Sequence, residues 1–139
     1  MTRSLAFAVA ASLLFAPGCK DPEQQELAVL ASAVERFHAA PEAATGARAQ
    51  DVQNTACKAQ RVCGVKALCV AATTALSRST ALRLELRGNT ADLDAGRLSP
   101  NTPEIISMLQ KLNESERLLT EGQKLLSDCD QELLRLKRP

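Results

Sequence analysis

Residues 105–136, IISMLQKLNESERLLTEGQKLLSDCDQELLRL, repeat apolar or small residues in alternating steps of three and four. Such a repeat places its members along one side of an α-helix, as in coiled coils and helical hairpins. Thr102 and Pro103 precede the repeat as a helix cap and a first helical residue. We therefore predict a helix from Pro103 to about Lys137 that packs along a seam. The seam residues are Ile105, Met108, Leu112, Ser115, Leu119, Gly122, Leu126, Cys129, Leu133 and Leu136.

A second long helix is predicted for residues 65–95, with Gly88 as a candidate point of interruption. If the two helices fold back on each other about the turn at Ser99 and Pro100, facing residues have numbers that sum to about 198. No stretch of the chain alternates apolar and polar residues as a half-buried strand would. The sequence therefore predicts an antiparallel helical hairpin.

The register of this hairpin determines which cysteines meet. With a sum of 198, Cys69 faces Cys129, and large residues oppose small ones or aliphatic residues oppose each other. The other pairs are Ala72 with Leu126, Leu76 with Gly122, Ser79 with Leu119, Leu86 with Leu112 and Leu93 with Ile105, whereas Arg83 opposite Ser115 is a poor match. A rival register with a sum of 192 would pair Cys63 with Cys129. That register places the cations Lys66 and Arg87 in the seam, so we prefer the first.

The N-terminus has the pattern of an export signal. Arg3 is followed by an uncharged apolar run over residues 5–16, which is too short to span a bilayer as a stable helix. The following stretch, FAPGCKDPEQ over residues 15–24, resembles the lipobox of bacterial lipoproteins, although Ala16 stands where that motif usually has leucine. The resemblance implies that residues 1–18 are removed and that Cys19 carries a covalent lipid. The alternative is an ordinary secretory signal that leaves Cys19 as a thiol.

Besides Cys19, four cysteines remain after such a leader: Cys57, Cys63, Cys69 and Cys129. An even number in an exported chain indicates two disulfides. A zinc site is the competing reading, but the cysteine spacing lacks the short gap of zinc knuckles, and the only histidine, His38, lies far upstream. The preferred register leaves Cys57 to pair with Cys63. Because six residues of helix would separate them by about 9 Å, the chain must leave the helix there, and Gly64 is the expected break.

Residues 24–38 predict an amphipathic first helix through Leu27, Leu30, Val34 and Phe37. Residues 39–50 contain Pro41 and Gly46 and are expected to be a flexible joint. Residues 19–50 would then comprise the lipid anchor, the first helix and this joint, and residues 51–139 a disulfide-bonded helical domain. The predicted fold is therefore all-α: a small helical bundle built on a long antiparallel hairpin and stapled by two disulfides.

The last helix has apolar residues that the hairpin seam does not use. Leu118, Leu125 and Leu134 form this spare edge. Either the first helix docks there, or the edge receives a helix from another protein. The three leucines are therefore candidate partner-binding residues.

Composition argues against several classes of function. Removal of Arg3 with the leader leaves 16 basic and 16 acidic residues, so no electrostatic case for nucleic acid arises. Phe37 is then the only aromatic residue, which leaves no stacking platform for bases or sugars. We find no catalytic motif, no metal-ligand pattern and no cofactor motif apart from the expected lipid on Cys19. The sequence therefore predicts a protein that is not an enzyme.

Three hypotheses for function follow. The first is an envelope lipoprotein, held in the membrane by its lipid, whose helical domain binds or scaffolds another envelope protein. The second is a pilotin-like chaperone that binds a helix of an outer-membrane secretin, by analogy of architecture alone. The third is a spacer like the murein lipoprotein, although this chain ends in Lys137, Arg138 and Pro139 rather than in a crosslinking lysine. Lys20, rather than aspartate, follows Cys19, which favours the outer membrane facing the periplasm. The oligomeric state is left open.

Overall fold

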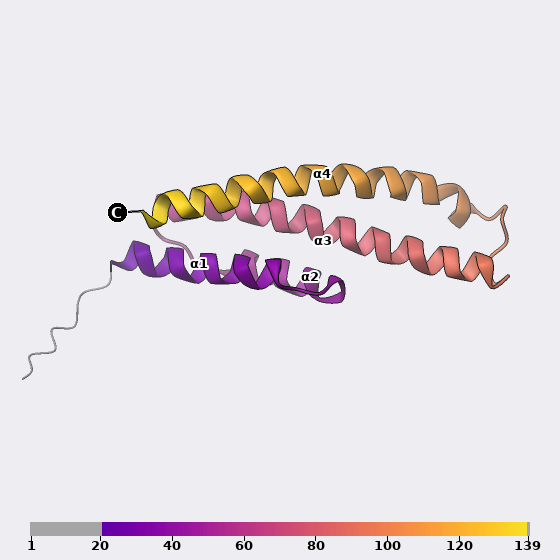
Figure 1. Cartoon of the computed structure of the whole chain (residues 1–139), viewed down its shortest axis with the longest axis horizontal. Helices are drawn as coiled ribbons and strands as arrows, with labels where there is room; N and C mark the ends of the chain where they lie inside the picture. Colours follow the sequence, from indigo (N-terminus) through magenta and orange to yellow (C-terminus); the bar gives the residue numbers. More distant parts are fainter. Residues whose placement is uncertain (1–20, 139) are drawn as a thin grey trace, which may run out of the picture.

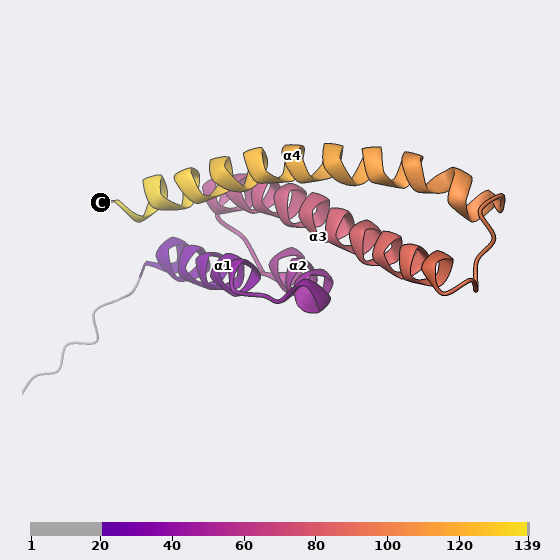
Figure 2. The ribbon, with the colours of Figure 1, turned by 45° about the vertical axis from the view of Figure 1, so that its right-hand side comes forward.

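The computed structural model describes residues 21–138, and helices are the only regular secondary structure in this part of the chain. Two long helices form an antiparallel hairpin, and the shorter ones lie along one half of it (Figures 1 and 2). The elements are α1 (Pro22–His38), a 3-10 turn η1 (Glu42–Ala44), α2 (Thr45–Asn54), α3 (Gln60–Asp94) and α4 (Pro103–Lys137). The all-α hairpin expected from the sequence is therefore confirmed.

Local signals explain where the helices begin. The Asp21 carboxylate accepts a hydrogen bond from the backbone N–H of Glu23 at 3.1 Å, and Pro22 follows as the first helical residue of α1. At the start of α4, Thr102 holds the expected cap position, and its carbonyl accepts from the N–H groups of the third and fourth residues after it. Its side chain, however, makes no capping hydrogen bond. Proline at the first helical position is thus the shared signal of both starts.

The helix α3 continues through Gly88 and ends at Asp94, two residues before Gly96. Gly96 has a φ of 68°, a left-handed conformation that glycine adopts without steric cost. The N–H groups of Arg97 and Leu98 donate to the carbonyl of Asp92, which closes the helix end. The expected interruption at Gly88 is therefore wrong, because a glycine inside a long helix costs only about 1 kcal/mol.

The segment expected to be a flexible joint is mostly helical. Within residues 39–50, η1 begins at Glu42 and α2 at Thr45. The reason is packing: Ala49 and Val52 of α2 are buried, and α2 lies against α3. Pro41 immediately precedes the 3-10 turn, so it marks a corner rather than a linker.

The chain leaves the helix between α2 and α3, as the spacing of Cys57 and Cys63 requires. Their Cα atoms lie 5.3 Å apart in a disulfide. The break, however, covers residues 55–59, and Gly64 lies inside α3. The Glu26 carboxylate of α1 accepts hydrogen bonds from the backbone N–H of Lys58 at 2.8 Å and of Ala59 at 3.1 Å. The irregular segment is therefore held by a disulfide and by α1.

The hairpin follows the predicted register at its disulfide end. Cys69 and Cys129 form the second disulfide, with Cα atoms 5.1 Å apart, and Gly122 lies against Leu76. Farther along, Ser79 contacts Ser115 instead of the expected Leu119, one turn away. This shift arises because a repeat of 3.5 residues drifts around a helix of 3.6 residues per turn. The residues of α4 that are buried are Ser115, Leu118, Gly122, Leu126, Cys129, Leu133 and Leu136.

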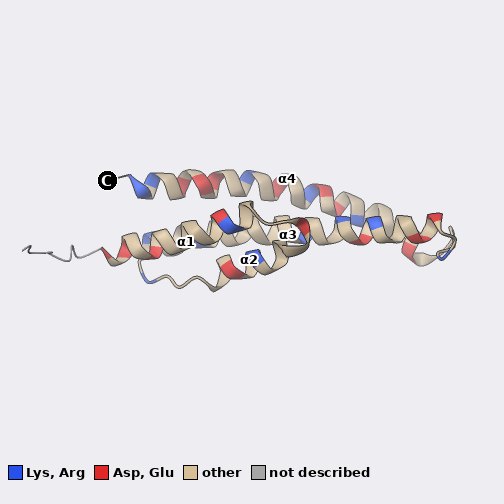
Figure 3. Ribbon diagram, turned by 60° about the horizontal axis from the view of Figure 1, so that its bottom comes forward, with Lys and Arg blue, Asp and Glu red and all other residues tan. Residues whose placement is uncertain are grey.

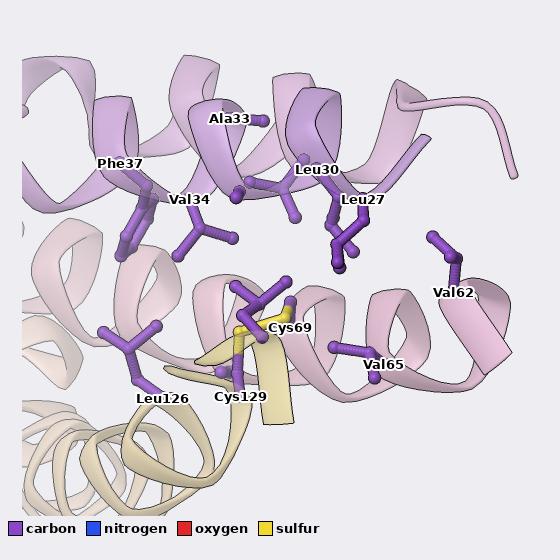
Figure 4. Close-up of a cluster of buried hydrophobic side chains, with 14 of the residues drawn as sticks. Leu27, Leu30, Ala33, Val34, Phe37, Val62, Val65, Cys69, Leu126 and Cys129 are labelled. Carbon is purple, nitrogen blue, oxygen red and sulfur yellow. A yellow bond between two sulfur atoms is a disulfide. The ribbon is translucent and has the colours of Figure 1, made fainter. Parts of the chain in front are cut away.

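The hydrophobic core lies where α1 packs on the disulfide half of the hairpin (Figure 4). All four predicted apolar residues of the first helix are buried. Leu27, Leu30 and Val34 are each 1% exposed, and Phe37 is 6% exposed. They join a cluster with Val62, Val65, Cys69, Leu126, Cys129 and Leu133. The core therefore surrounds the Cys69–Cys129 disulfide.

Candidate functional site

Half of the hairpin has no core. No side chain from Thr80 to Glu114 is buried, whereas Ser79 and Ser115, which flank this stretch, are each 1% exposed. We call residues 80–114 the arm. In the ribbon views the arm is the part of α3 and α4 that projects beyond α1 and α2 (Figures 1 and 2). It is a layer of two helices that lacks the third helix found at the disulfide end.

The arm also carries most of the large apolar side chains that are exposed in the described chain. Four of the six large apolar side chains that stand out as exposed in the described chain belong to it. These are Leu84 and Leu112, each 41% exposed, and Ile106 and Leu109, each 70% exposed. The other two, Val29 and Leu134, lie outside the arm. Single exposed leucines are common on proteins, but a group on one projection is typical of an interaction surface.

Helical periodicity shows which side of the arm faces the same way as α1. The His38 Nε2 atom lies 3.1 Å from a carboxylate oxygen of Asp130, so Asp130 marks the side of α4 that α1 contacts. Leu112 precedes Asp130 by 18 residues, which is five full helical turns, and Ile105 precedes it by 25, which is close to seven. Both therefore lie on the side of α4 that α1 covers at the disulfide end.

The same reasoning applies to α3. Arg87 forms an ion pair with Glu42 of η1, which places Arg87 on the covered side of the hairpin. Arg83 and Leu84, four and three residues earlier, share that side. We call the resulting surface the arm face. Its residues are Arg83, Leu84 and Arg87 of α3 and Ile105, Leu109, Leu112 and Glu116 of α4, of which Glu116 lies two residues past the end of the arm.

The two edges of the hairpin differ in whether their charged residues form ion pairs. On the edge opposite the arm face, Arg78 pairs with Glu114 at 3.7 Å and Lys111 with Glu85 at 2.6 Å, so these cations and carboxylates link α3 to α4. On the arm face, Arg83 and Glu116 make no ion pair with any described residue. Basic and acidic residues are interspersed along both helices (Figure 3). The arm face thus combines leucines with one unpaired cation and one unpaired carboxylate.

The candidate partner residues Leu118, Leu125 and Leu134 do not form one surface. Leu118 is only 7% exposed, because it occupies the seam position between Ser115 and Gly122 that was assigned to Leu119. Leu125 is half-buried against the core, and Leu134 is 57% exposed. The spare edge is therefore corrected: only Leu134 is open to a partner. Cys19, the expected lipidation site, lies outside the described residues.

The arm face could have been found from the sequence by a second repeat. Ile105, Leu109, Leu112, Glu116 and Leu119 are spaced by four, three, four and three residues, beside the seam repeat. Such a double pattern indicates a helix with two neighbours. Among the described elements, only α3 runs beside the N-terminal half of α4 (Figures 1 and 2).

The disulfide end has a shallow hollow between α1 and α4, but its chemistry is limited. It measures about 300 Å³ and contains the His38–Asp130 pair beside Leu133 and Leu134. All shifted pKa values have simple structural causes elsewhere. Hydrogen bonds from the backbone of Lys58 and Ala59 lower the pKa of Glu26. Arg117 lowers the pKa of Glu114, while Glu114 and Glu132 raise the pKa values of Arg117 and Arg135.

Within residues 21–138, no group of His, Cys, Asp and Glu side chains could hold a metal ion. The helices of this part are also not both long and apolar enough to cross a bilayer. Its exposed apolar residues and unpaired charges make the arm face the candidate functional site. Comparison of the chain with models of known protein families, with curated proteins and with solved structures gave no match.

Proposed function

We propose that the protein is an envelope lipoprotein without catalytic activity, and that its helical domain binds another protein. The observation that carries the proposal is the arm, where four large apolar side chains are exposed and no side chain is buried. In the free protein these apolar side chains face water. A partner that covered it would remove apolar surface from water, which is the main driving force of protein association.

The envelope location rests on the resemblance of residues 15–24 to a lipobox. Labelled fatty acid should be incorporated into the wild-type protein and not into the Cys19→Ser variant, which should leave the membrane fraction or persist as a precursor. Acylated protein should fractionate with the outer membrane. A wild-type protein that carries no acyl label would contradict this part of the proposal.

The binding function can be tested in the source cell with the full chain. A photo-crosslinking amino acid is placed singly at Leu109 or Leu112 on the arm, and at Val29 or Leu134 as exposed apolar positions outside it. We expect a discrete protein adduct from the arm positions and none from the other two. Absence of any protein adduct from all four positions would overturn the binding function.

The identity of the captured protein separates the remaining hypotheses. A secretin would identify the protein as a pilotin-like chaperone, and another envelope protein would identify it as a binding or scaffolding module. An adduct with peptidoglycan in place of protein would support a structural spacer instead.

A further inference from the structure

We propose that the arm face receives one amphipathic α-helix of the partner protein, which extends the line of α1 along the hairpin. This helix presents leucine-like side chains to the arm, a carboxylate to Arg83 and a basic residue to Glu116. The inference rests on the proposed binding function and specifies its partner chemistry. It follows from three observations: the position of α1, the length of the uncovered face and the two unpaired charges.

The disulfide half of the hairpin shows how this side of α3 and α4 is covered. There α1 places Leu27, Leu30 and Val34 against both long helices, and ion pairs flank the contact. Glu23 of α1 lies 3.6 Å from Arg61 of α3, and His38 lies 3.1 Å from Asp130 of α4. The same side of the arm repeats this composition with leucines between Arg83 and Glu116. A helix is therefore the shape that this side of the hairpin accommodates.

The uncovered length sets the size of the helix. From Ile105 to Glu116 the arm face extends along α4 for 11 residues, or about 17 Å at 1.5 Å per residue. A helix of three to four turns covers this length. At its disulfide end the face meets η1, whose Glu42 pairs with Arg87. Arg83 lies about one turn nearer the disulfide end than Arg87, so the end of the partner helix lies beside η1, and α1 keeps its place.

The two unpaired charges select the flanks of the partner helix. Arg83 belongs to α3 and Glu116 to α4, and neither has an ion-pair partner among residues 21–138. A carboxylate of the partner helix would pair with Arg83 along the α3 flank, and a basic residue would pair with Glu116 along the α4 flank. Such charges fix the orientation and register of a bound helix, in addition to the apolar contact.

A second copy of the chain fits this face less well. Because α1, η1 and α2 occupy the same side of the hairpin, two arms can meet face to face only with their long axes antiparallel. The two-fold axis then sets each helix across from its own counterpart. Only residues at the level of the axis would meet their own counterparts, and with the axis midway along the face Glu116 would lie across from Ile105 instead of a cation. The charge pattern therefore favours a different protein as the occupant.

The chain's own termini also lie away from the arm. The described chain begins at Asp21 and ends at Arg138, and both lie at the disulfide end (Figure 1). A segment that precedes α1 would have to pass the full length of α1, about 25 Å for its 17 residues, before it reached the arm face.

The test maps the contacts of the arm in the source cell with the full chain. Photo-crosslinkers at Ile105, Leu109 and Leu112 lie on one line of α4, and the crosslinked partner residues are identified by mass spectrometry. If the occupant is a helix, the partner residues should be spaced by three or four within one segment. That segment should carry acidic residues on one flank and basic residues on the other.

Charge reversal then tests the flanks. Arg83→Glu and Glu116→Lys should each lower the crosslinking yield at Leu112 about tenfold, because attraction becomes repulsion. Reversal of the facing charge in the partner segment should restore the yield. Lys124→Glu is the matched control, since Lys124 is an exposed cation of α4 outside the arm face. All three variants should keep the midpoint of thermal unfolding within about 3 °C.

Several outcomes would overturn the inference while the binding function stands. These are partner adducts only at Val29 or Leu134, contacted residues at the spacing of an extended strand, or yields that ignore the charge reversals. Crosslinks to a second copy, to lipid or to residues 1–20 would likewise replace the partner helix with another occupant. Absence of every protein adduct would instead remove the proposed function itself.

Discussion

Small residues determine how closely α3 and α4 approach. Ser79 Oγ donates a hydrogen bond to the carbonyl of Ser115 at 2.8 Å, and the two hydroxyl oxygens lie 3.3 Å apart, so both buried hydroxyls have partners. Gly122 provides a second close approach, because a Cβ atom there would lie 2.7 Å from Leu76 Cγ. These contacts lie in the half of the hairpin that has a core, and Ser115 is the last buried residue before the arm.

Gly122→Ala should destabilise the protein by about 1–3 kcal/mol, because the added Cβ also lies only 3.1 Å from the Leu76 backbone nitrogen, which cannot move independently of its helix. Gly88→Ala is the control in α3, since no atom lies within 4 Å of the added Cβ. That change should stabilise the protein by about 0.5–1 kcal/mol. Denaturant unfolding measures both, and equal effects would show that Gly122 is not a close contact.

Glu26 links stability to pH. Hydrogen bonds from the N–H groups of Lys58 and Ala59 lower its pKa in the folded protein, so this contribution is fully present above the unfolded value near pH 4.5 and is lost as pH falls through the lower folded value. Glu26→Gln should therefore destabilise the protein most at neutral pH. The difference from wild type should shrink below about pH 4 when unfolding is measured across pH. A difference that grows in acid would contradict the role of the carboxylate.

At the scale of elements, the sequence predicts the long helices better than the short ones. The apolar repeat and the Thr102–Pro103 start specify α4 to its last residue, and the register that joins Cys69 to Cys129 follows from the same repeat. The segment that contains α2 was expected to be flexible because Pro41 and Gly46 dominate its local signal. Its helix depends on the burial of Ala49 and Val52, and a local sequence pattern does not show that these two residues will be covered.

The candidate site was less predictable for a similar reason. Leu118 and Leu119 are adjacent, and a drift of a fraction of a turn decides which of them enters the seam. Whether the arm is covered depends on where α1 ends relative to the hairpin. The sequence of α4 does not predict that position. The repeat from Ile105 to Leu119 was visible, but its lack of a neighbour was not.

The two disulfides should contribute unequally to the hairpin. Cys69–Cys129 closes 60 residues, for which the chain-entropy model gives about 4 kcal/mol, whereas Cys57–Cys63 closes six, for which it gives about 2 kcal/mol. Replacing both members of the first pair by alanine should therefore lower the free energy of unfolding more than the same change in the second pair. Denaturant unfolding of the two double variants tests this order. Equal losses would show that strain or residual structure outweighs loop length.

At the scale of the whole molecule, the structure divides into a three-layered half and a two-helix half. Backbone hydrogen bonds are helical in both, but buried side chains support them only in the disulfide half. Local stability should follow this division, because segments with few buried contacts open at low free-energy cost.

Amide hydrogen exchange should therefore be fastest in the arm. We expect residues 80–94 and 103–114 to exchange well before residues 62–79 and 115–136 of the same two helices. Exchange is measured by mass spectrometry on the free protein. The two halves of the same helix are compared with each other. Uniform protection along α3 would show that the hairpin unfolds only as one unit.

The Cys69–Cys129 bridge also turns the hairpin into a covalent ring. The disulfide joins the two ends of the segment from Cys69 to Cys129, whose Cα atoms lie 5.1 Å apart. The arm is the part of this ring farthest from the disulfide. When the arm unfolds, both of its ends stay attached to the folded half. The unfolded segment is therefore a closed loop, not a free chain. Because the entropy of a loop rises only slowly with its length, re-closing the arm is a local event. The ring therefore allows the arm to open while the half that holds the core stays folded.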